Sequence, residues 1–84
     1  MEKRIALVGI ILEDAGQAES INTILHGYGD YIIGRMGIPY RERGVHIISV
    51  AMDAPTPAVS AMTGKLGNLP GVSVKTVYQK QKEN

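Results

Sequence analysis

The stretch that decides the fold is GRMGIPYRERG, residues 34–44. It lies between two apolar runs, YII at residues 31–33 and VHIISVAM at residues 45–52. Apolar, β-branched runs separated by glycine and proline are typical of a β-hairpin, because Gly and Pro end strands and form turns. We therefore predict two antiparallel strands in the middle of the chain, over residues 31–36 and 45–52, with the third strand broken at residues 53–55.

Each side of this hairpin carries one further strand and one helix. The apolar run IALVGIIL, residues 5–12, is typical of a central strand. Asp14 is placed to cap the first helix by accepting from the N–H of Gln17, whose side chain would reach back as in a capping box. Apolar residues three and four apart then predict an amphipathic helix that ends near Gly27: Ala18, Ile21, Ile24, Leu25 and Tyr28.

The second half of the chain is predicted to form a second helix and a last strand. Thr56 is a candidate N-cap with Pro57 at the first helical position, where a missing N–H costs little. Residues 58–69 carry the apolar stripe of a second helix, and Pro70-Gly71 forms a turn. Along residues 72–79 the side chains alternate in character as they do in a half-buried β-strand, which predicts the last strand of the fold.

The resulting order, β-α-β-β-α-β, is that of the ferredoxin-like sandwich, an α+β fold. Right-handed crossovers place both helices on one face of a four-stranded antiparallel sheet. We predict a single domain over residues 1–79 and a polar, frayed C-terminal tail over residues 80–84.

Both faces of this sheet are expected to be apolar, although only one carries helices. In the third strand, Ile48 and Val50 lie on one face and Val45 and Ile47 on the other. A bare apolar face would be a large exposed patch, and small domains often gain burial from another chain. We therefore expect a homo-oligomer, either a homodimer or a homotetramer.

Composition narrows the class of protein. The 84 residues carry a net charge of +1 and contain no cysteine. The charge gives no argument for nucleic-acid binding, and the missing thiols exclude disulfides and thiol catalysis within the chain. No apolar run approaches the ~20 residues of a membrane span. We expect a cytoplasmic protein with no membrane partner.

Three segments carry a resemblance to a known family: residues 4–12, residues 31–45 (YIIGRMGIPYRERGV) and residues 64–75 (GKLGNLPGVSVK). Together they resemble the iron-only hydrogenase system regulators, small stand-alone domains. The resemblance implies an ACT-like, ferredoxin-like domain, similar to the C-terminal sensing domain of nickel-responsive regulators, which assembles as an oligomer. It also implies a regulatory role, which for this family follows from association with hydrogenase genes.

The nickel site of those sensing domains is not carried over. Such sites use several histidines and a cysteine, whereas here only His46 lies on a central strand and Ile48 stands where a second histidine would be needed. No metal site and no cofactor are predicted for the single chain, and a site shared between protomers through His46 stays open. A separate DNA-binding element, which those regulators carry, has no room in this chain.

The first candidate site is the hairpin, with Arg35, Tyr40, Arg41 and Arg43. These arginines either keep an exposed turn solvated, with Glu42 partly neutralising them, or bind an anion or a protein partner, because guanidinium suits carboxylate and phosphate. Direct nucleic-acid binding through the hairpin is the alternative and is not favoured. If all six arginines of a dimer contacted phosphates, the logarithm of the binding constant would fall with the logarithm of the salt concentration with a slope of about −5.

The second candidate site is the turn at residues 13–16, with Asp14 and Gly16. Asp14 either only caps the helix, or the turn binds a small effector at a subunit interface, as the resemblance to ACT-like domains implies.

Catalysis has little support, because no serine lies in a nucleophile elbow and no His–Asp pair is visible. We expect a regulatory or sensor domain that is not an enzyme, in which an effector or partner engages the subunit interface. A small ferredoxin-like enzyme is the least favoured alternative.

Overall fold

The computed structural model describes residues 2–80, and the predicted tail therefore lies, beyond Lys80, outside the described residues. Four strands and two helices follow one another in the predicted order. They are β1 (Lys3–Leu12), α1 (Ala18–Gly27), β2 (Ile32–Tyr40), β3 (Val45–Pro55), α2 (Thr56–Gly67) and β4 (Val72–Tyr78).

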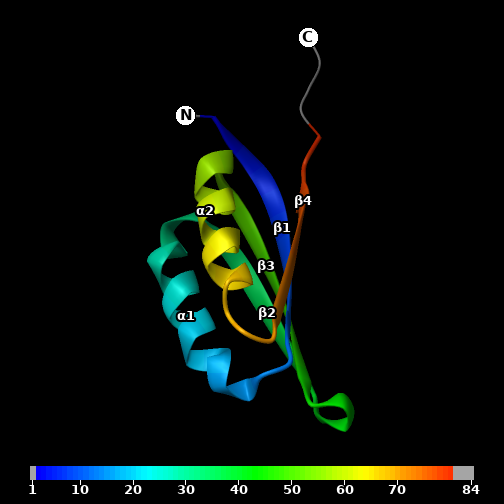
Figure 1. Ribbon diagram of the computed structural model, residues 1–84. Coiled ribbons are helices and arrows are strands. Elements are labelled where there is room, and N and C mark those ends of the chain that lie inside the picture. Colours follow the sequence, from blue (N-terminus) through cyan, green and yellow to red (C-terminus); the bar gives the residue numbers. More distant parts are fainter. Residues whose placement is uncertain (1, 81–84) are drawn as a thin grey trace.

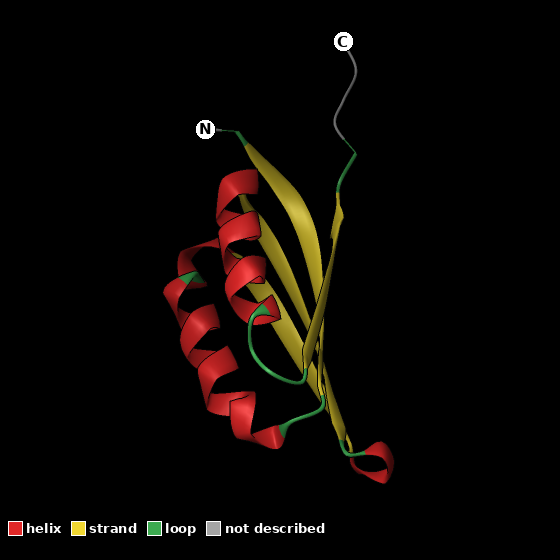
Figure 2. Ribbon diagram, viewed as in Figure 1, coloured by secondary structure: helices red, strands yellow, loops and turns green. Residues whose placement is uncertain are grey.

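The strands form one antiparallel sheet in the order β2-β3-β1-β4. Both helices lie on the same side of this sheet, and the other side carries no helix (Figures 1 and 2). The predicted ferredoxin-like α+β fold is confirmed. The strand order places β1 and β3 in the centre and leaves β2 and β4 as edge strands.

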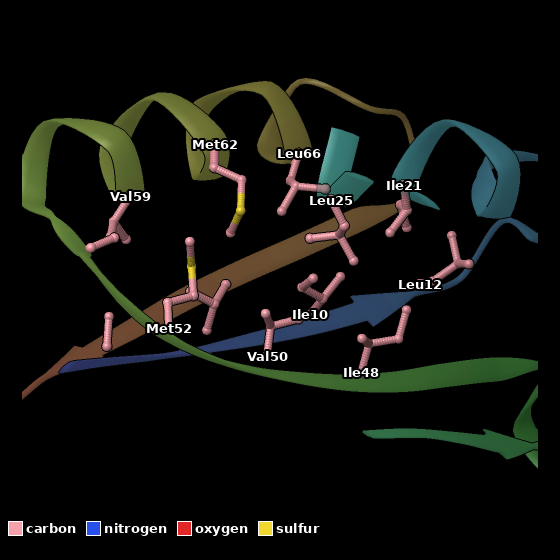
Figure 3. Close-up of a cluster of buried hydrophobic side chains, with 13 residues drawn as sticks. Ile10, Leu12, Ile21, Leu25, Ile48, Val50, Met52, Val59, Met62 and Leu66 are labelled. Atoms are coloured by element: carbon pink, nitrogen blue, oxygen red, sulfur yellow. The ribbon is translucent and has the colours of Figure 1, made fainter. Parts of the chain in front are cut away.

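The core fills the space between the sheet and the helices. Alternate residues of β1 and β3 point toward the helices, so each strand buries one set of side chains and exposes the other. In Figure 3, Met62 of α2 points down toward Met52 of β3. The buried residues are all apolar: Ala6, Val8, Ile10, Leu12, Ile21, Leu25, Ile48, Val50, Met52, Ala54, Val59, Met62 and Leu66. Burial of one valine, leucine, isoleucine or methionine side chain stabilises the folded state by about 1.5–3 kcal/mol relative to leaving it exposed to water.

Strand β2 is longer than predicted and continues through Pro39 to Tyr40. Proline has no N–H to give to a ladder, but β2 is an edge strand that pairs only with β3, where proline is tolerated.

Strand β3 also runs further than predicted, and the expected break at residues 53–55 is wrong. Asp53, Ala54 and Pro55 remain paired with β1, opposite Ile5, Arg4 and Lys3. Ala54 is fully buried, so its contribution to the core holds the strand in register past the position where sequence signals end it.

The predicted capping box at Asp14 is wrong, because the Asp14 carboxylate accepts a hydrogen bond from Gly16 and not from Gln17. The Gly16 N–H donates to Asp14 Oδ1 at 2.9 Å, while the Gln17 N–H donates to the Asp14 main-chain carbonyl at 2.9 Å. The main-chain bond makes a 3-10 turn over Ala15–Gln17, and α1 begins only at Ala18. Helix α2 begins at Thr56 itself, one residue before its predicted start, with Pro55 in the cap position.

Candidate functional site

The side of the sheet that faces away from the helices is strongly apolar; we call it the open face. Within residues 2–80, eight of the nine exposed large apolar side chains lie there, as their cross-strand pairs show. They are Ile5, Leu7, Ile11, Met36, Ile38, Tyr40, Ile47 and Val77. These side chains come from all four strands, and a row of Ser49, Gly9 and Lys75 lies between their two main groups.

Two cross-strand rows form most of the open face. Ile38 of β2, Ile47 of β3 and Ile11 of β1 lie side by side in one row. In the second, Leu7 of β1 lies between Ala51 and Val77. Each of these isoleucines and Leu7 is between 43% and 48% exposed, so they retain apolar area that a contact could bury.

The hairpin between β2 and β3 extends past the rest of the domain (Figure 1). Its tip is a 3-10 turn over Arg41–Arg43, ended by Gly44 in the left-handed conformation at φ 66°. Arg41 and Arg43 are exposed there, and the Tyr40 hydroxyl donates to Glu42 Oε2 at 3.0 Å. The tip therefore offers two guanidinium groups beside one carboxylate that is already engaged.

The three arginines predicted as one cluster are divided in the structure. Arg35 lies opposite Val50 and therefore points to the helix side of the sheet. Its Nη2 donates to Asn22 Oδ1 of α1 at 2.9 Å. Only Arg41 and Arg43 share the tip, while Arg35 belongs to the space between β2 and α1.

The second predicted site, Asp14 and Gly16, lies in the turn between β1 and α1. The Asp14 carboxylate is engaged by the Gly16 N–H, and the Glu13 N–H donates to the Gly71 carbonyl at 2.8 Å. The turn is thus fastened to the loop before β4. Of its residues, Ala15 faces the hairpin, across a 330 Å³ cavity that Tyr40 and Arg41 also line.

Sequence reasoning missed Asn22, and it considered His46 only as a metal ligand, not as a residue of these cavities. His46 is the neighbour of Leu12 and Pro39 across the sheet, and it lines the cavities on the helix side of β2 and β3. The signal that could have found it is strand parity, since His46 is an even-numbered residue of β3, like the buried Ile48 and Val50. Within residues 2–80, no three His, Asp or Glu side chains come together as a metal site would need.

No helix in the described part of the chain has the length and hydropathy to span a membrane.

Comparisons with known proteins agree with this architecture. No curated protein matches the chain. A formyltetrahydrofolate deformylase from Pseudomonas putida KT2440 is 12% identical, with a TM-score of 0.62 over 86% of this chain and 28% of its own, and shows the fold alone. The uncharacterized protein TM1266 from Thermotoga maritima is 38% identical, with a TM-score of 0.89 over 94% of this chain and 100% of its own.

The family model described as "TM1266-like: Iron-only hydrogenase system regulator, putative" matches residues 4–76. This range covers both helices and the whole sheet except the first residue of β1 and the last two residues of β4. With the structural match over the whole length of TM1266, it confirms the family that the sequence resembles, and the chain belongs to the TM1266-like family.

Proposed function

We propose that the protein is a non-catalytic regulatory component of an iron-only hydrogenase system and that it works as a homo-oligomer joined through the open face. The regulatory role comes from the description of its family. The observation that supports self-association is the pair of apolar rows, which leave Leu7, Ile11 and Ile47 nearly half exposed in the single chain. Sheet-to-sheet packing of two copies would remove these side chains from water.

Regulation then works through the equilibrium between arrangements of the oligomer. An effector or protein partner that binds one arrangement more tightly shifts the population toward it, by no more than its difference in affinity. The hairpin tip, with Tyr40, Arg41 and Arg43, is the exposed polar element available for a partner. The turn at Asp14 and Gly16 is the second element at which an effector would bind.

The test of self-association is sedimentation velocity over a range of concentrations. Leu7→Lys places a charge in the centre of the open face and is expected to convert the oligomer to monomer. Ala61→Lys adds the same charge to an exposed position of α2, on the helix layer, and is expected to leave the assembly unchanged. A wild-type protein that sediments as a monomer at every concentration would exclude the proposal.

Direct nucleic-acid binding is a second candidate, favoured by the projection of Arg41 and Arg43 beyond the domain. Since Arg35 is bonded to α1, a dimer offers four tip arginines rather than six. Four phosphate contacts give a log–log salt slope of about −3.6.

Fluorescence anisotropy with duplex DNA at several salt concentrations tests this candidate. Arg41→Ala with Arg43→Ala is expected to flatten the slope, whereas Lys3→Ala, at the other end of the sheet, is expected to change it little. DNA binding with the same slope in wild type and in the double variant would remove the hairpin from consideration.

A further inference from the structure

Helix α1 does not cover edge strand β2 at Arg35 and Gly37, nearer the hairpin tip than the half-buried Ile32. Ile48 and Val50 of β3 are 9% and 0% exposed beneath the helices, but their partners on β2, Gly37 and Arg35, are exposed. The helix layer therefore ends over β3, and the helix side of β2 forms one wall of a recess.

This recess is a cavity of 220 Å³ between α1 and the hairpin strands. Ala18 and Asn22 of α1 line one side, and Arg35 and Gly37 of β2 line the other. A second cavity of 330 Å³ continues it toward the hairpin tip, and the two share Leu12, Pro39 and His46. We call the two cavities together the α1–β2 groove. Its size suits a small metabolite, since such sites begin at about 300 Å³.

A glycine keeps the groove open. Gly37 lies opposite Ile48 on the helix side of the sheet, where a side chain would point toward α1. A Cβ placed on Gly37 would meet no atom within 4 Å, so a larger residue has free space to occupy. Most other residues at this position would fill the groove without any conflict with the fold.

The groove has an apolar floor and basic walls. Leu12, Pro39 and Ile48 provide the apolar surface. Arg35, His46 and, toward the tip, Arg41 provide cationic or donor groups, and neither cavity is lined by Asp or Glu. The walls therefore complement a negative charge.

The guanidinium of Arg35 is held in place for such a charge. Its Nη2 donates to Asn22 Oδ1 at 2.9 Å, which places the guanidinium beside α1. A guanidinium has five N–H donors, so four are left for a ligand, and the Asn22 amide nitrogen can donate beside them. Arginine in a fixed orientation binds carboxylate and phosphate through two parallel hydrogen bonds.

We propose that the α1–β2 groove binds a small organic anion, whose carboxylate or phosphate contacts Arg35 and whose apolar body lies on Leu12 and Pro39. The groove is on the helix side of the sheet. The proposal therefore goes beyond self-association through the open face and does not depend on it.

Titrations followed by amide chemical shifts test the proposal, with four probes. Phenylacetate and phenyl phosphate carry an anion and an apolar ring, phenylacetamide is neutral, and inorganic phosphate lacks the ring. The first or second probe is expected to give saturable shifts at Asn22, Arg35, Gly37 and His46, and the response of one rather than the other distinguishes carboxylate from phosphate. Equal binding of phenylacetate and phenylacetamide, or of phenyl phosphate and inorganic phosphate, overturns the proposal, as does the absence of saturable shifts for all four.

Two pairs of variants locate the binding. Gly37→Val fills the groove, and Gly34→Val adds the same side chain to the open face of the same strand, opposite Ala51, again with no atom within 4 Å. Arg35→Gln removes the groove cation, and Arg43→Gln removes one from the tip. Arg35→Gln is expected to weaken binding about tenfold or more, through the loss of one charge-assisted contact. Gly37→Val is expected to weaken it at least as much, because its side chain occupies the space of the ligand. Their partners are expected to keep wild-type affinity.

Unchanged affinity in both groove variants overturns the proposal, and so does an equal loss in Gly34→Val. Spectra without ligand establish that each variant is folded. If Gly37→Val does not fold, Arg35→Gln and Arg35→Lys decide the question, because lysine keeps the charge but loses the paired hydrogen bonds. Sedimentation of the same variants reports on self-association separately, so loss of anion binding leaves the open-face proposal standing.

Discussion

Gly71 approaches Asp14 so closely that a Cβ on Gly71 would lie 2.9 Å from the Cβ of Asp14. Gly71 also has a φ of 72°, in the left-handed region that favours glycine. The contact joins the loop before β4 to the turn after β1, where the Gly71 carbonyl also accepts from the Glu13 N–H. Glycine is therefore required twice at this position, once for its backbone and once for its size.

Gly71→Ala is expected to lower the free energy of unfolding by about 2–4 kcal/mol, through left-handed strain together with overpacking. Gly44→Ala is the matched control, because Gly44 has a φ of 66° but nothing within 4 Å of its Cβ. That variant is expected to lose only about 1–2 kcal/mol. Urea denaturation of both variants measures the difference. Equal losses of unfolding free energy would mean that the close approach of Asp14 does not destabilise Gly71→Ala.

Neighbouring isoleucines of β1 are expected to have different roles. Ile10 is 1% exposed and Ile11 is 46% exposed on the open face. Ile10→Ala should lower stability by about 2–5 kcal/mol, because it leaves a cavity in the core.

In contrast, Ile11→Ala should cost the single chain less than about 1 kcal/mol. Its main effect should appear as weaker self-association. Denaturation at several protein concentrations separates the two effects, and an Ile11→Ala loss that does not depend on concentration would count against the open-face interface.

Arg4 fastens the end of β4 to the start of β1. Its guanidinium carbon lies 4.8 Å from the centre of the Tyr78 ring, and its Nη2 donates to the Gln79 carbonyl. Arg4→Ala is expected to destabilise the protein by about 1 kcal/mol. A double-mutant cycle with Tyr78→Leu isolates the cation–π contribution, and additive losses would show that Arg4 acts through the hydrogen bond alone.

The tip arginines are expected to contribute little to folding. Arg41 and Arg43 are exposed, so Arg41→Ala with Arg43→Ala should change the free energy of unfolding by less than about 0.5 kcal/mol. Thermal denaturation checks this. A larger loss would assign them a structural role and would weaken any use of the double variant as a binding test.

The order of strands and helices could be predicted because each signal is local. The alternation of β4 and the helical spacing of Ile21 and Leu25 both survive in the structure. The ends of β2 and β3 could not be predicted, because a proline usually ends a strand. Strand β2 continues through Pro39 because it is an edge strand that pairs only with β3. Strand β3 continues to Pro55 because the buried Ala54 keeps it paired with β1.

The candidate site was less predictable than the fold. The arginines of the hairpin form a cluster in sequence, but Arg35 lies within β2 and bonds to α1, whereas Arg41 and Arg43 lie in the turn that begins after β2 ends at Tyr40. The α1–β2 groove could not be predicted, because it depends on where α1 packs on the sheet, and the spacing of residues within one helix or strand does not determine that position. Gly37 looked like a turn glycine, although it lies within a strand.

The strand order also sets the sequence of events during synthesis. β1 leaves the ribosome before the other three strands of the sheet, yet one of its two edges pairs with β4, which emerges after them. Until residues 72–78 emerge, that edge carries free N–H and C=O groups beside apolar side chains, a combination that invites pairing with other nascent chains. Even after β3 has paired with the other edge of β1, this edge therefore stays open to wrong pairing until β4 is complete.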